Sequence, residues 1–350
     1  MENPSEKQPT PLSELGEFKL IKRLTENLTS KNKNVLQSVG DDAAVIKTGK
    51  NEVLLVTTDM LCEGVHFDLL YTPSMHLGYK AVVANLSDIY AMNGEPQQIT
   101  VSLGLSNRMS VEFLEDLYKG MSLACEQYKV DIVGGDTVSS KSGLIISITA
   151  MGTAEEKNVV YRSTAGENDL ICVSGDLGAA YMGLQLLERE KNVFESTKGI
   201  QPDLSGNDYI LERQLKPEAR RDVIEALKIA EVKPTSMIDI SDGLSSDLLH
   251  LTEGSGIGAS IYEEKIPIDP ATAMMAEQFN IGPVTAALNG GEDYELLFTI
   301  DLKDHEKVAG IPSISIIGHM TGKNEACNLV TISNAIVPIK ASGWQAFSEE

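Results

Sequence analysis

The sequence of 350 residues lacks several features that would assign it to a common class of protein. Its four cysteines are widely scattered and form no Cys-x-x-Cys pair, so we expect free thiols instead of disulfides or a zinc site. No apolar run reaches the ~18 residues that a membrane span requires, and the first residues lack the basic and apolar regions of a signal peptide. These absences predict a cytoplasmic protein with no membrane partner.

Positive charge is scarce as well. The chain has 29 Lys and Arg against 51 Asp and Glu, which gives a formal net charge of -22. Because an acidic surface repels both a nucleic-acid backbone and an anionic membrane, we expect neither as a partner. Anionic small substrates remain compatible with this charge if bound cations reverse the sign of the field inside the site.

The common catalytic signatures are missing too. The sequence has no P-loop, no His-Arg-Asp or Asp-Phe-Gly of the protein kinases, no His-Glu-x-x-His and no Gly-x-Ser-x-Gly. Its five histidines are too dispersed to indicate a zinc site. Any chemistry must therefore depend on the acidic residues.

Carboxylates are what the chain does have, and they recur at the ends of apolar runs. Three such runs, at 53–59, 130–136 and 237–242, each end in an aspartate, and further aspartates occur in the segment 40–42 and at Asp88. Two bare carboxylates ~5 Å apart repel by roughly 3 kcal/mol at an effective dielectric near 20. A cluster of them therefore predicts bound cations, and ligands that are all oxygen favour Mg²⁺, Ca²⁺ or Mn²⁺ over zinc.

Several of these acids also have an ordinary structural interpretation. Asp42 lies in a turn-like Gly-Asp-Asp segment, where Asp commonly bonds its own backbone. Asp242 comes where a helix is predicted to begin and could be only its N-cap. The Gly-Gly-Asp run at 134–136 offers bare backbone amides beside a carboxylate, but could be a simple turn. Their joint occurrence is what favours the metal interpretation.

Other acids are harder to explain without a ligand. Asp88 falls within a predicted helix, on a small and polar strip, although Asp is disfavoured inside helices. Asp239 falls within a predicted buried strand, where an unpaired carboxylate is costly. Asp59 follows Thr57 and Thr58, so hydroxyl, carbonyl and carboxylate oxygens could all face one ion.

The order of strands and helices predicts an α+β protein, because the strands and helices do not alternate regularly as in a doubly wound sheet. The residues 191–208 are polar and contain glycine and proline, so we expect a surface insertion there. Our division of the chain is a tail at 1–12, an N-terminal domain at 13–153, a linker at 154–169 and a C-terminal domain at 170–350.

Acidic ligands without a base–nucleophile pair indicate phosphoryl transfer, in which positioning and cationic charge do most of the catalysis. Arg162 could clamp a phosphate, with an ordinary surface arginine as the alternative.

The motifs taken together resemble thiamine-monophosphate kinase, from about Glu14 to Trp344. The resemblance is carried by Gly40-Asp-Asp-Ala-Ala44, Thr57-Thr-Asp-Met-Leu-Cys-Glu-Gly-Val-His-Phe67, Asn85-Leu-Ser-Asp88, Gly134-Gly-Asp-Thr137, Asp239-Ile-Ser-Asp-Gly243 and Gly290-Gly-Glu-Asp-Tyr-Glu295. It implies the two-domain fold of the aminoimidazole ribonucleotide synthetase-like superfamily. In that fold an N-terminal α/β domain dimerises through its sheet into a barrel, and a C-terminal α/β domain follows.

The resemblance also implies an activity and a set of residues. The expected reaction is direct in-line transfer from ATP to thiamine monophosphate with Mg²⁺, which is the last step of thiamine diphosphate synthesis. The implied ATP contacts are Gly135, Asp136, Arg162 and Ser241, and the implied contacts of thiamine monophosphate are His66, Glu292 and Trp344. The implied ligands of several Mg²⁺ ions are Asp42, Thr57, Thr58, Asp59, Asp88, Asp136, Asp239 and Asp242.

Relatives within the superfamily fit less well. Selenophosphate synthetase would need a reactive cysteine or selenocysteine before Cys62, and the hydrogenase-maturation relative ends in a cysteine, whereas this chain ends in Ser-Glu-Glu. Aminoimidazole ribonucleotide synthetase is the nearest rival. A non-catalytic cation-binding protein is the alternative from another class, but the chain has no Asp-x-Asp-x-Asp-Gly calcium loop.

Overall fold

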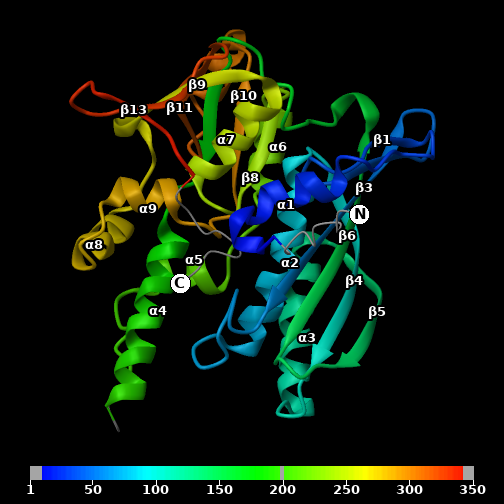
Figure 1. The fold of residues 1–350 in the computed structure, drawn as a ribbon, viewed down its shortest axis with the longest axis vertical. Helices are drawn as coiled ribbons and strands as arrows, with labels where there is room; N and C mark the ends of the chain where they lie inside the picture. The colour runs from blue at the N-terminus through cyan, green and yellow to red at the C-terminus, as the bar shows by residue number, and fades with distance from the viewer. Residues whose placement is uncertain (1–9, 198–200, 342–350) are drawn as a thin grey trace, which may run out of the picture.

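Two β-sheets, one from each half of the chain, organise the protein (Figure 1). The structure is a computed structural model that describes residues 10–197 and 201–341. Most neighbouring strands are antiparallel. The pairs β4–β5 and β9–β12 are parallel. The fold is thus a mixed α/β fold with mainly antiparallel sheets, not a doubly wound parallel one.

The first sheet has six strands in the order β1-β2-β3-β6-β4-β5. Their bounds are β1 (Val35–Gln37), β2 (Ala44–Lys47), β3 (Glu52–Cys62), β4 (Glu95–Leu105), β5 (Asp131–Ser139) and β6 (Ile145–Glu155). Alternate residues of β3, such as Val53 and Leu55, are fully buried, as expected for strands with one covered face. Along the chain, β6 is the last of these strands, and it extends two residues into the segment 154–169 that we expected to be a linker.

Helices α2 (Ser74–Ala91) and α3 (Val111–Tyr128) cover one face of this sheet (Figure 1). The two helices cross closely because both have glycine at the crossing point. A Cβ on Gly78 would lie 2.0 Å from the Leu117 carbonyl oxygen, and one on Gly120 would lie 1.8 Å from that of Met75. Nearly every residue of α2 from Leu77 onward is buried, so polar side chains on this helix need partners.

The second sheet has seven strands in the order β13-β12-β9-β11-β7-β10-β8. Their bounds are β7 (Leu170–Ser174), β8 (Ser236–Ile240), β9 (Ile257–Tyr262), β10 (Glu295–Ile300), β11 (Ile314–Lys323), β12 (Cys327–Val330) and β13 (Ile336–Pro338). Strand β7 is buried on both faces, with Ile171 and Val173 in one core cluster and Cys172 in another. Helix α7 (Leu244–Ser255) contributes to the first of these clusters, and α6 (Arg221–Ile229) contributes to the second.

The remaining helices pack beside this sheet and form a cluster of their own around Met182 and Ile210. They are α4 (Ala179–Ser196), α5 (Asp208–Leu215), α8 (Pro270–Gln278) and α9 (Pro283–Asn289). The other described helical elements are α1 (Gly16–Thr25), α10 (His305–Val308) and the 3₁₀ turns η1 (Leu12–Glu14), η2 (Glu156–Asn158), η3 (Glu263–Lys265) and η4 (Leu302–Asp304). No helix of the described residues is long and apolar enough to cross a membrane.

The expected surface insertion at 191–208 is partly wrong. Helix α4 continues to Ser196 instead of ending near residue 190, and α5 already begins at Asp208. The extension is stabilised by tertiary contacts that local sequence does not reveal, since the Lys191 ammonium lies 2.8 Å from the Asp68 carboxylate of the first half. Residues 191–196 belong to this helix, whereas residues 201–207 form no helix or strand, as expected for an insertion.

Candidate active site at the junction of the two sheets

Three carboxylates from distant parts of the chain meet where the two sheets approach one another. Asp42 comes from the loop before β2, Asp88 from α2 and Asp239 from β8, the edge strand of the second sheet. Each offers one oxygen, and these oxygens all lie within 4.8 Å of one another. We call Asp42, Asp88 and Asp239 the carboxylate cluster.

Helix α2 positions one side of the cluster through its small polar strip. The hydroxyl of Thr57 on β3 donates a 2.5 Å hydrogen bond to Oδ2 of Asp88. One turn earlier on α2, the side-chain oxygen of Asn85 accepts a 3.0 Å hydrogen bond from the backbone N–H of Asp59. The Asn85 amide itself donates to the carbonyl of Ala81. These bonds hold the end of β3 against the helix, which explains the polar strip noticed in the sequence.

The same helix also reaches the second sheet. Ser87, which is fully buried, donates a 2.7 Å hydrogen bond to Oδ2 of Asp239. Asp239 is only 4% exposed, and its strand β8 contacts α2. A buried strand carboxylate is therefore tied to the helix that carries Asp88.

Burial and mutual repulsion make the charged form of these acids unfavourable. Burial raises the pKa of Asp59 and of Asp239 to about 6. Burial, followed by the charges of Asp59, Asp239 and Asp42, raises the pKa of Asp88 well above its usual range. Burial, with the charges of Asp239 and Asp41, also raises the pKa of Asp42 well above its usual range, although the charge of Arg162 opposes that shift. Asp59 thus lies close enough to the carboxylate cluster to repel both Asp88 and Asp239.

The residues present fit a divalent cation. Oδ2 of Asp42 is buried without a hydrogen-bond partner, although an ionised carboxylate has lone pairs to satisfy. The cluster consists only of carboxylate oxygens, which suit Mg²⁺. The carboxylate cluster could therefore hold such an ion, and a bound divalent cation would lower the pKa values of these carboxylates.

Arg162 supplies positive charge at this point of the junction. Its guanidinium hydrogen-bonds Oδ1 of Asp42, and its backbone N–H donates to Asp41 at 3.3 Å. Burial raises the pKa of Asp41 to about 6, although the charge of Arg162 opposes the shift. Arg162 is therefore a partly buried, paired cation. The alternative that the sequence allowed, an ordinary surface arginine, is wrong.

Two further acids extend the site along α7. Asp247 is 2% exposed in the first turn of α7, and its Oδ2 accepts a hydrogen bond of 3.3 Å from the backbone N–H of Asp242. Burial and the charges of Asp242 and Asp239 raise the pKa of Asp247 well above its usual range. Asp242 itself is not the N-cap, because Gly243 occupies that position. Our sequence reasoning missed Asp247, because in the sequence it resembles an ordinary acid in the first turn of a helix.

The loop 290–294 brings a second group of polar residues to the junction. The backbone N–H of Glu292 donates to the carbonyl of Ser241 at 2.8 Å, which places the loop beside the end of β8. One carboxylate oxygen of Glu292 lies 2.9 Å from the ammonium of Lys80 on α2. The other accepts a 3.0 Å hydrogen bond from the amide of Gln214 on α5. Our sequence reasoning identified Ser241 and Glu292 but missed Lys80 and Gln214.

Several predicted residues lie elsewhere. The hydroxyl of Thr58 donates to the Ile148 carbonyl on the uncovered face of the sheet, opposite to Thr57, because strand residues alternate. His66 lies in the turn after β3, where its Nδ1 accepts a hydrogen bond from the backbone N–H of Cys62 at 3.1 Å. Trp344 lies outside the described residues.

The predicted Gly135 and Asp136 also stand apart from the carboxylate cluster. They lie on β5, at the edge of the first sheet, and both are exposed. The register places Asp59 and Gly135 in one row across β3, β6, β4 and β5, so three strand spacings, about 14 Å, separate them. Asp136 belongs to the next row and points to the opposite face from Asp59. Within one chain, this aspartate does not join the other acids.

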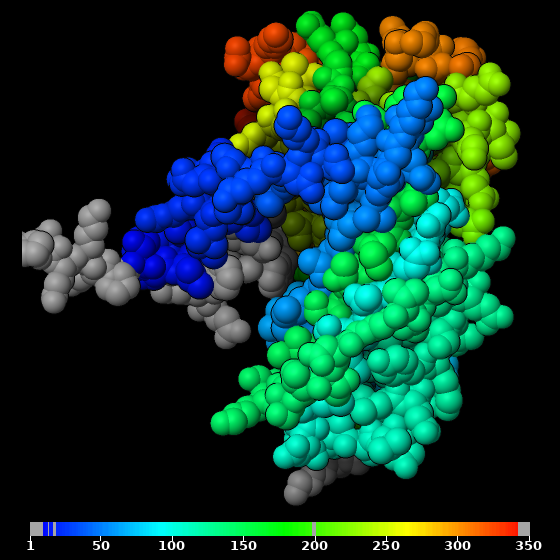
Figure 2. Space-filling model, turned by 90° about the vertical axis from the view of Figure 1, so that its right-hand side faces the viewer, coloured from blue at the N-terminus to red at the C-terminus, as the bar shows by residue number. Residues whose placement is uncertain are grey.

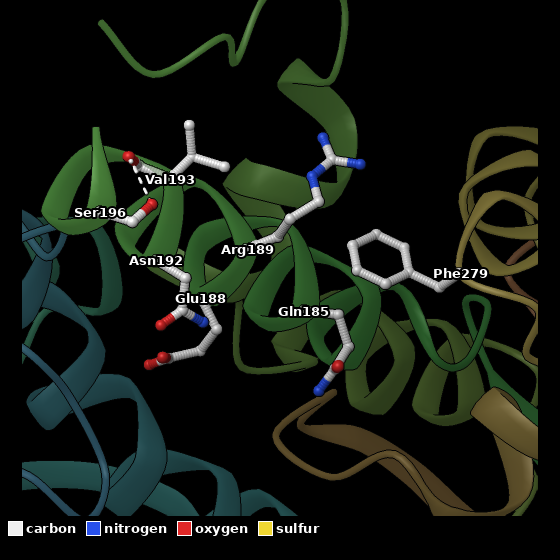
Figure 3. Close-up of a pocket in the computed structure, with 7 residues that line it drawn as sticks. All are labelled: Gln185, Glu188, Arg189, Asn192, Val193, Ser196 and Phe279. Carbon is white, nitrogen blue, oxygen red and sulfur yellow. Dashed lines mark hydrogen bonds between the residues drawn. The ribbon is translucent and has the colours of Figure 1, made fainter. Parts of the chain in front are cut away.

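A cavity of about 420 Å³ lies on the outer side of α4 and is not this site (Figure 3). Its lining includes Arg189, whose guanidinium lies 5.1 Å from the ring centre of Phe279. Glu188, also in the lining, accepts a 2.6 Å hydrogen bond from the hydroxyl of Tyr71. None of the carboxylates at the junction of the two sheets contributes to it.

Comparison with known proteins agrees with this geometry. Residues 40–154 match the family described as AIR synthase related protein, N-terminal domain. A thiamine-monophosphate kinase of Buchnera aphidicola subsp. Schizaphis graminum is 36% identical over 340 residues, which are 95% of this chain and 99% of the relative. The enzyme of the same name from Aquifex aeolicus is 38% identical over 82% of this chain and 87% of the relative.

Solved structures show the same likeness. A structure described as "AaThiL complexed with AMPPCP and TMP" matches with a TM-score of 0.81 and 33% identity, over 97% of this chain and 99% of that one. A HypE–HypF complex matches with a TM-score of 0.69 but only 19% identity, which shows the fold alone. The sequence relatives and this fold together establish that the chain belongs to the thiamine-monophosphate kinase family.

Proposed function

We propose that this chain phosphorylates thiamine monophosphate to thiamine diphosphate, with ATP as the phosphoryl donor. The observation that carries the proposal is the carboxylate cluster of Asp42, Asp88 and Asp239 in a member of this family. The solved relative described with AMPPCP, an ATP analogue, and TMP supports both substrates. Cations at such a cluster would offset the repulsion between two anionic reactants in an acidic protein.

The carboxylate cluster would hold Mg²⁺, which would supply charge neutralisation to the transferring phosphoryl group. Thr57 and Asp59 would complete the coordination, because both lie close to Asp88. Thr57 donates a hydrogen bond to Asp88, and the charge of Asp59 raises the pKa of Asp88. The proposed ligands of several ions are Asp42, Thr57, Thr58, Asp59, Asp88, Asp136, Asp239 and Asp242. Of these, Thr58 and Asp136 depend on the family resemblance and not on the geometry of one chain.

The protein residues would bind and align the two reactants. Arg162 would contact the ATP phosphates together with Gly135, Asp136 and Ser241. Glu292, already oriented by two hydrogen-bond partners, would meet thiamine monophosphate with His66 and Trp344. Ser241 and Glu292 are joined through their backbones, so the two substrates would bind side by side.

The transfer itself would be direct. An oxygen of the substrate phosphate attacks the γ-phosphorus of ATP, the bond from that phosphorus to the β–γ bridging oxygen breaks, and ADP leaves. The carboxylates of the cluster would hold ions and would not attack phosphorus themselves, so we expect no phosphoenzyme. Positioning and charge would supply the rate enhancement.

We further propose the two-domain arrangement, the tail at 1–12, the linker at 154–169 and a homodimer that acts in the cytoplasm. The face of the first sheet away from α2 and α3 supports the dimer, because no helix among the described residues covers it (Figures 1 and 2). Met60 on that face is 55% exposed, and Val133 and Val138 on the edge strand β5 are also exposed. A barrel closed by a second sheet would cover these apolar residues and pair the free edge.

A coupled assay for thiamine diphosphate, with and without Mg²⁺, tests the function. We expect formation of thiamine diphosphate and ADP in equal amounts, only when ATP, thiamine monophosphate and Mg²⁺ are all present. ADP release that thiamine monophosphate fails to stimulate would contradict the proposal. A non-catalytic cation-binding protein would release no ADP at all.

A further inference from the structure

Lys80 is an unusual residue in its position. It lies in the middle of α2, among residues that are almost all buried, and its side chain is only 4% exposed. An ammonium group removed from water is costly unless it is paired and hydrogen-bonded. The structure therefore has to supply partners for it, and the partners come from the other half of the chain.

Those partners fix the ammonium at one point. It lies 2.9 Å from Oε1 of Glu292 and donates a 3.2 Å hydrogen bond to the backbone carbonyl of Gln214. Gln214 belongs to the last turn of α5, where the helix dipole favours a positive charge. Lys80 thus joins α2, α5 and the loop 290–294.

Gln214 completes the arrangement from the opposite side of Glu292. Its side-chain amide donates to Oε2 of Glu292 at 3.0 Å, so each oxygen of the carboxylate has its own donor. Gln214 is 4% exposed, so its amide donates to Glu292 away from solvent. Two donors on two oxygens fix both the position and the rotation of the carboxylate.

The backbone of Glu292 would not hold this geometry unaided. Its φ is 66°, in the left-handed region that a residue with a Cβ adopts only at an energetic cost. Tyr294, two residues later, also has a positive φ, of 51°. Such strain persists where surrounding contacts stabilise it, and the contacts here are Lys80 on the side chain and Ser241 on the backbone.

We propose that Lys80 is a positioning residue, which orients Glu292 to receive thiamine monophosphate and so contributes to the selection of that substrate. The inference rests on the proposed function, in which Glu292 contacts this substrate. Lys80 itself contacts no reactant, because its ammonium is enclosed by Glu292 and Gln214. Its loss is therefore expected to affect binding of thiamine monophosphate and not binding of ATP.

The test uses Lys80→Met, which keeps the length of the side chain and removes its charge. We expect the KM for thiamine monophosphate to rise ~10-fold or more, while the KM for ATP changes less than ~2-fold. Lys47→Met is the matched control, because Lys47 forms a 2.6 Å ion pair with Glu156 in the first sheet, away from the junction. This control should leave both KM values unchanged.

A double-mutant cycle separates positioning from a merely structural role. If Lys80 acts through Glu292, then Lys80→Met should have little further effect on KM once Glu292 is replaced by Gln. Additive effects on KM, or an equal rise for ATP, would overturn the proposal. If Lys80→Met fails to fold, Lys80→Gln, which removes the charge and shortens the side chain, takes its place. A KM for thiamine monophosphate within ~2-fold of the wild-type value in that variant would overturn the proposal.

Failure of the proposed role of Lys80 can be distinguished from failure of the proposed function. A wild-type protein that forms no thiamine diphosphate would contradict the function itself. A wild-type protein that forms it, with an unaltered KM for thiamine monophosphate in the Lys80 variants, would contradict only the role of Lys80.

Discussion

Ser87 and Asp239 are joined by a 2.7 Å hydrogen bond, although 152 positions separate them in the chain. The bond links α2 of the first half to β8 of the second, and it uses Oδ2 of the carboxylate that belongs to the cluster. Residues that orient a metal ligand in this way commonly contribute 10–100-fold to metal affinity. The junction between the sheets is thus part of the proposed metal site.

Ser87→Ala should weaken Mg²⁺ binding by about 10-fold, because Asp239 loses the donor that orients it. Isothermal titration calorimetry without nucleotide measures this directly. Ser196→Ala, at an exposed hydroxyl near the end of α4, is the control and should bind Mg²⁺ as the wild type does. Equal affinities in both variants would mean that Ser87 does not orient a ligand.

Asp88→Asn should have opposite effects on activity and on metal-free stability. Turnover should fall at least ~100-fold, equivalent to ~2.7 kcal/mol of barrier, because a central carboxylate is lost. Without Mg²⁺ the thermal midpoint should rise, since the substitution removes a buried charge that Asp59, Asp239 and Asp42 repel.

Steady-state kinetics and thermal unfolding of the same variant check both effects. Asp116→Asn, on the exposed face of α3, serves as the control for each. Near-normal turnover in Asp88→Asn would remove this residue from the site.

The metal-free protein should lose stability as the pH rises. Burial raises the pKa of Asp59 and Asp239 from an ordinary 3.8 to about 6, so between these values the folded state binds more protons than the unfolded state. Their contribution to stability is therefore complete below about pH 4 and is lost as the pH rises through about 6. Thermal unfolding in EDTA across this range measures the slope.

The pH dependence of Mg²⁺ binding should have the opposite sign. Protons compete with the ion for these carboxylates, so affinity should increase through the same pH range and binding should release protons. Calorimetry in buffers of different ionisation enthalpy counts the protons. Affinity that is independent of pH between about 5 and 7 would exclude binding at these acids.

Removal of Arg162 should tighten Mg²⁺ binding in the absence of nucleotide. Its guanidinium hydrogen-bonds Asp42 and competes with any cation for that carboxylate. We expect Arg162→Met to bind Mg²⁺ several-fold more tightly and ATP more weakly, because the same side chain is proposed to contact phosphate. Weaker Mg²⁺ binding in this variant would show that Arg162 supports the ion site and does not compete with it.

The sequence predicted the acids of this site better than it predicted their partners. An aspartate inside a buried strand and another inside a helix are costly in isolation, so Asp239 and Asp88 were visible from the energetics of single residues. Local patterns also predicted a helix around Asp88, and the structure confirms it as α2. These features depend on residues that are close in the sequence, so the spacing of apolar residues predicts them.

Features that depend on tertiary contacts were not visible. Lys80 resembles any helical lysine until α5 and Glu292 surround it, and Asp247 resembles an ordinary acid in the first turn of a helix. The position of Asp136 depends on strand order, which places β5 at the edge of the sheet and far from Asp59. No local pattern specifies that order.

The central claim is that carboxylates from both sheets gather divalent ions between two anionic reactants. The most direct measurement is a crystal structure with an ATP analogue, thiamine monophosphate and Mn²⁺, in which anomalous scattering locates the ions. We predict ions bound by Asp42, Asp88 and Asp239, next to the terminal phosphate of the nucleotide. Ions found only elsewhere, or these three carboxylates parted around an empty site, would contradict it.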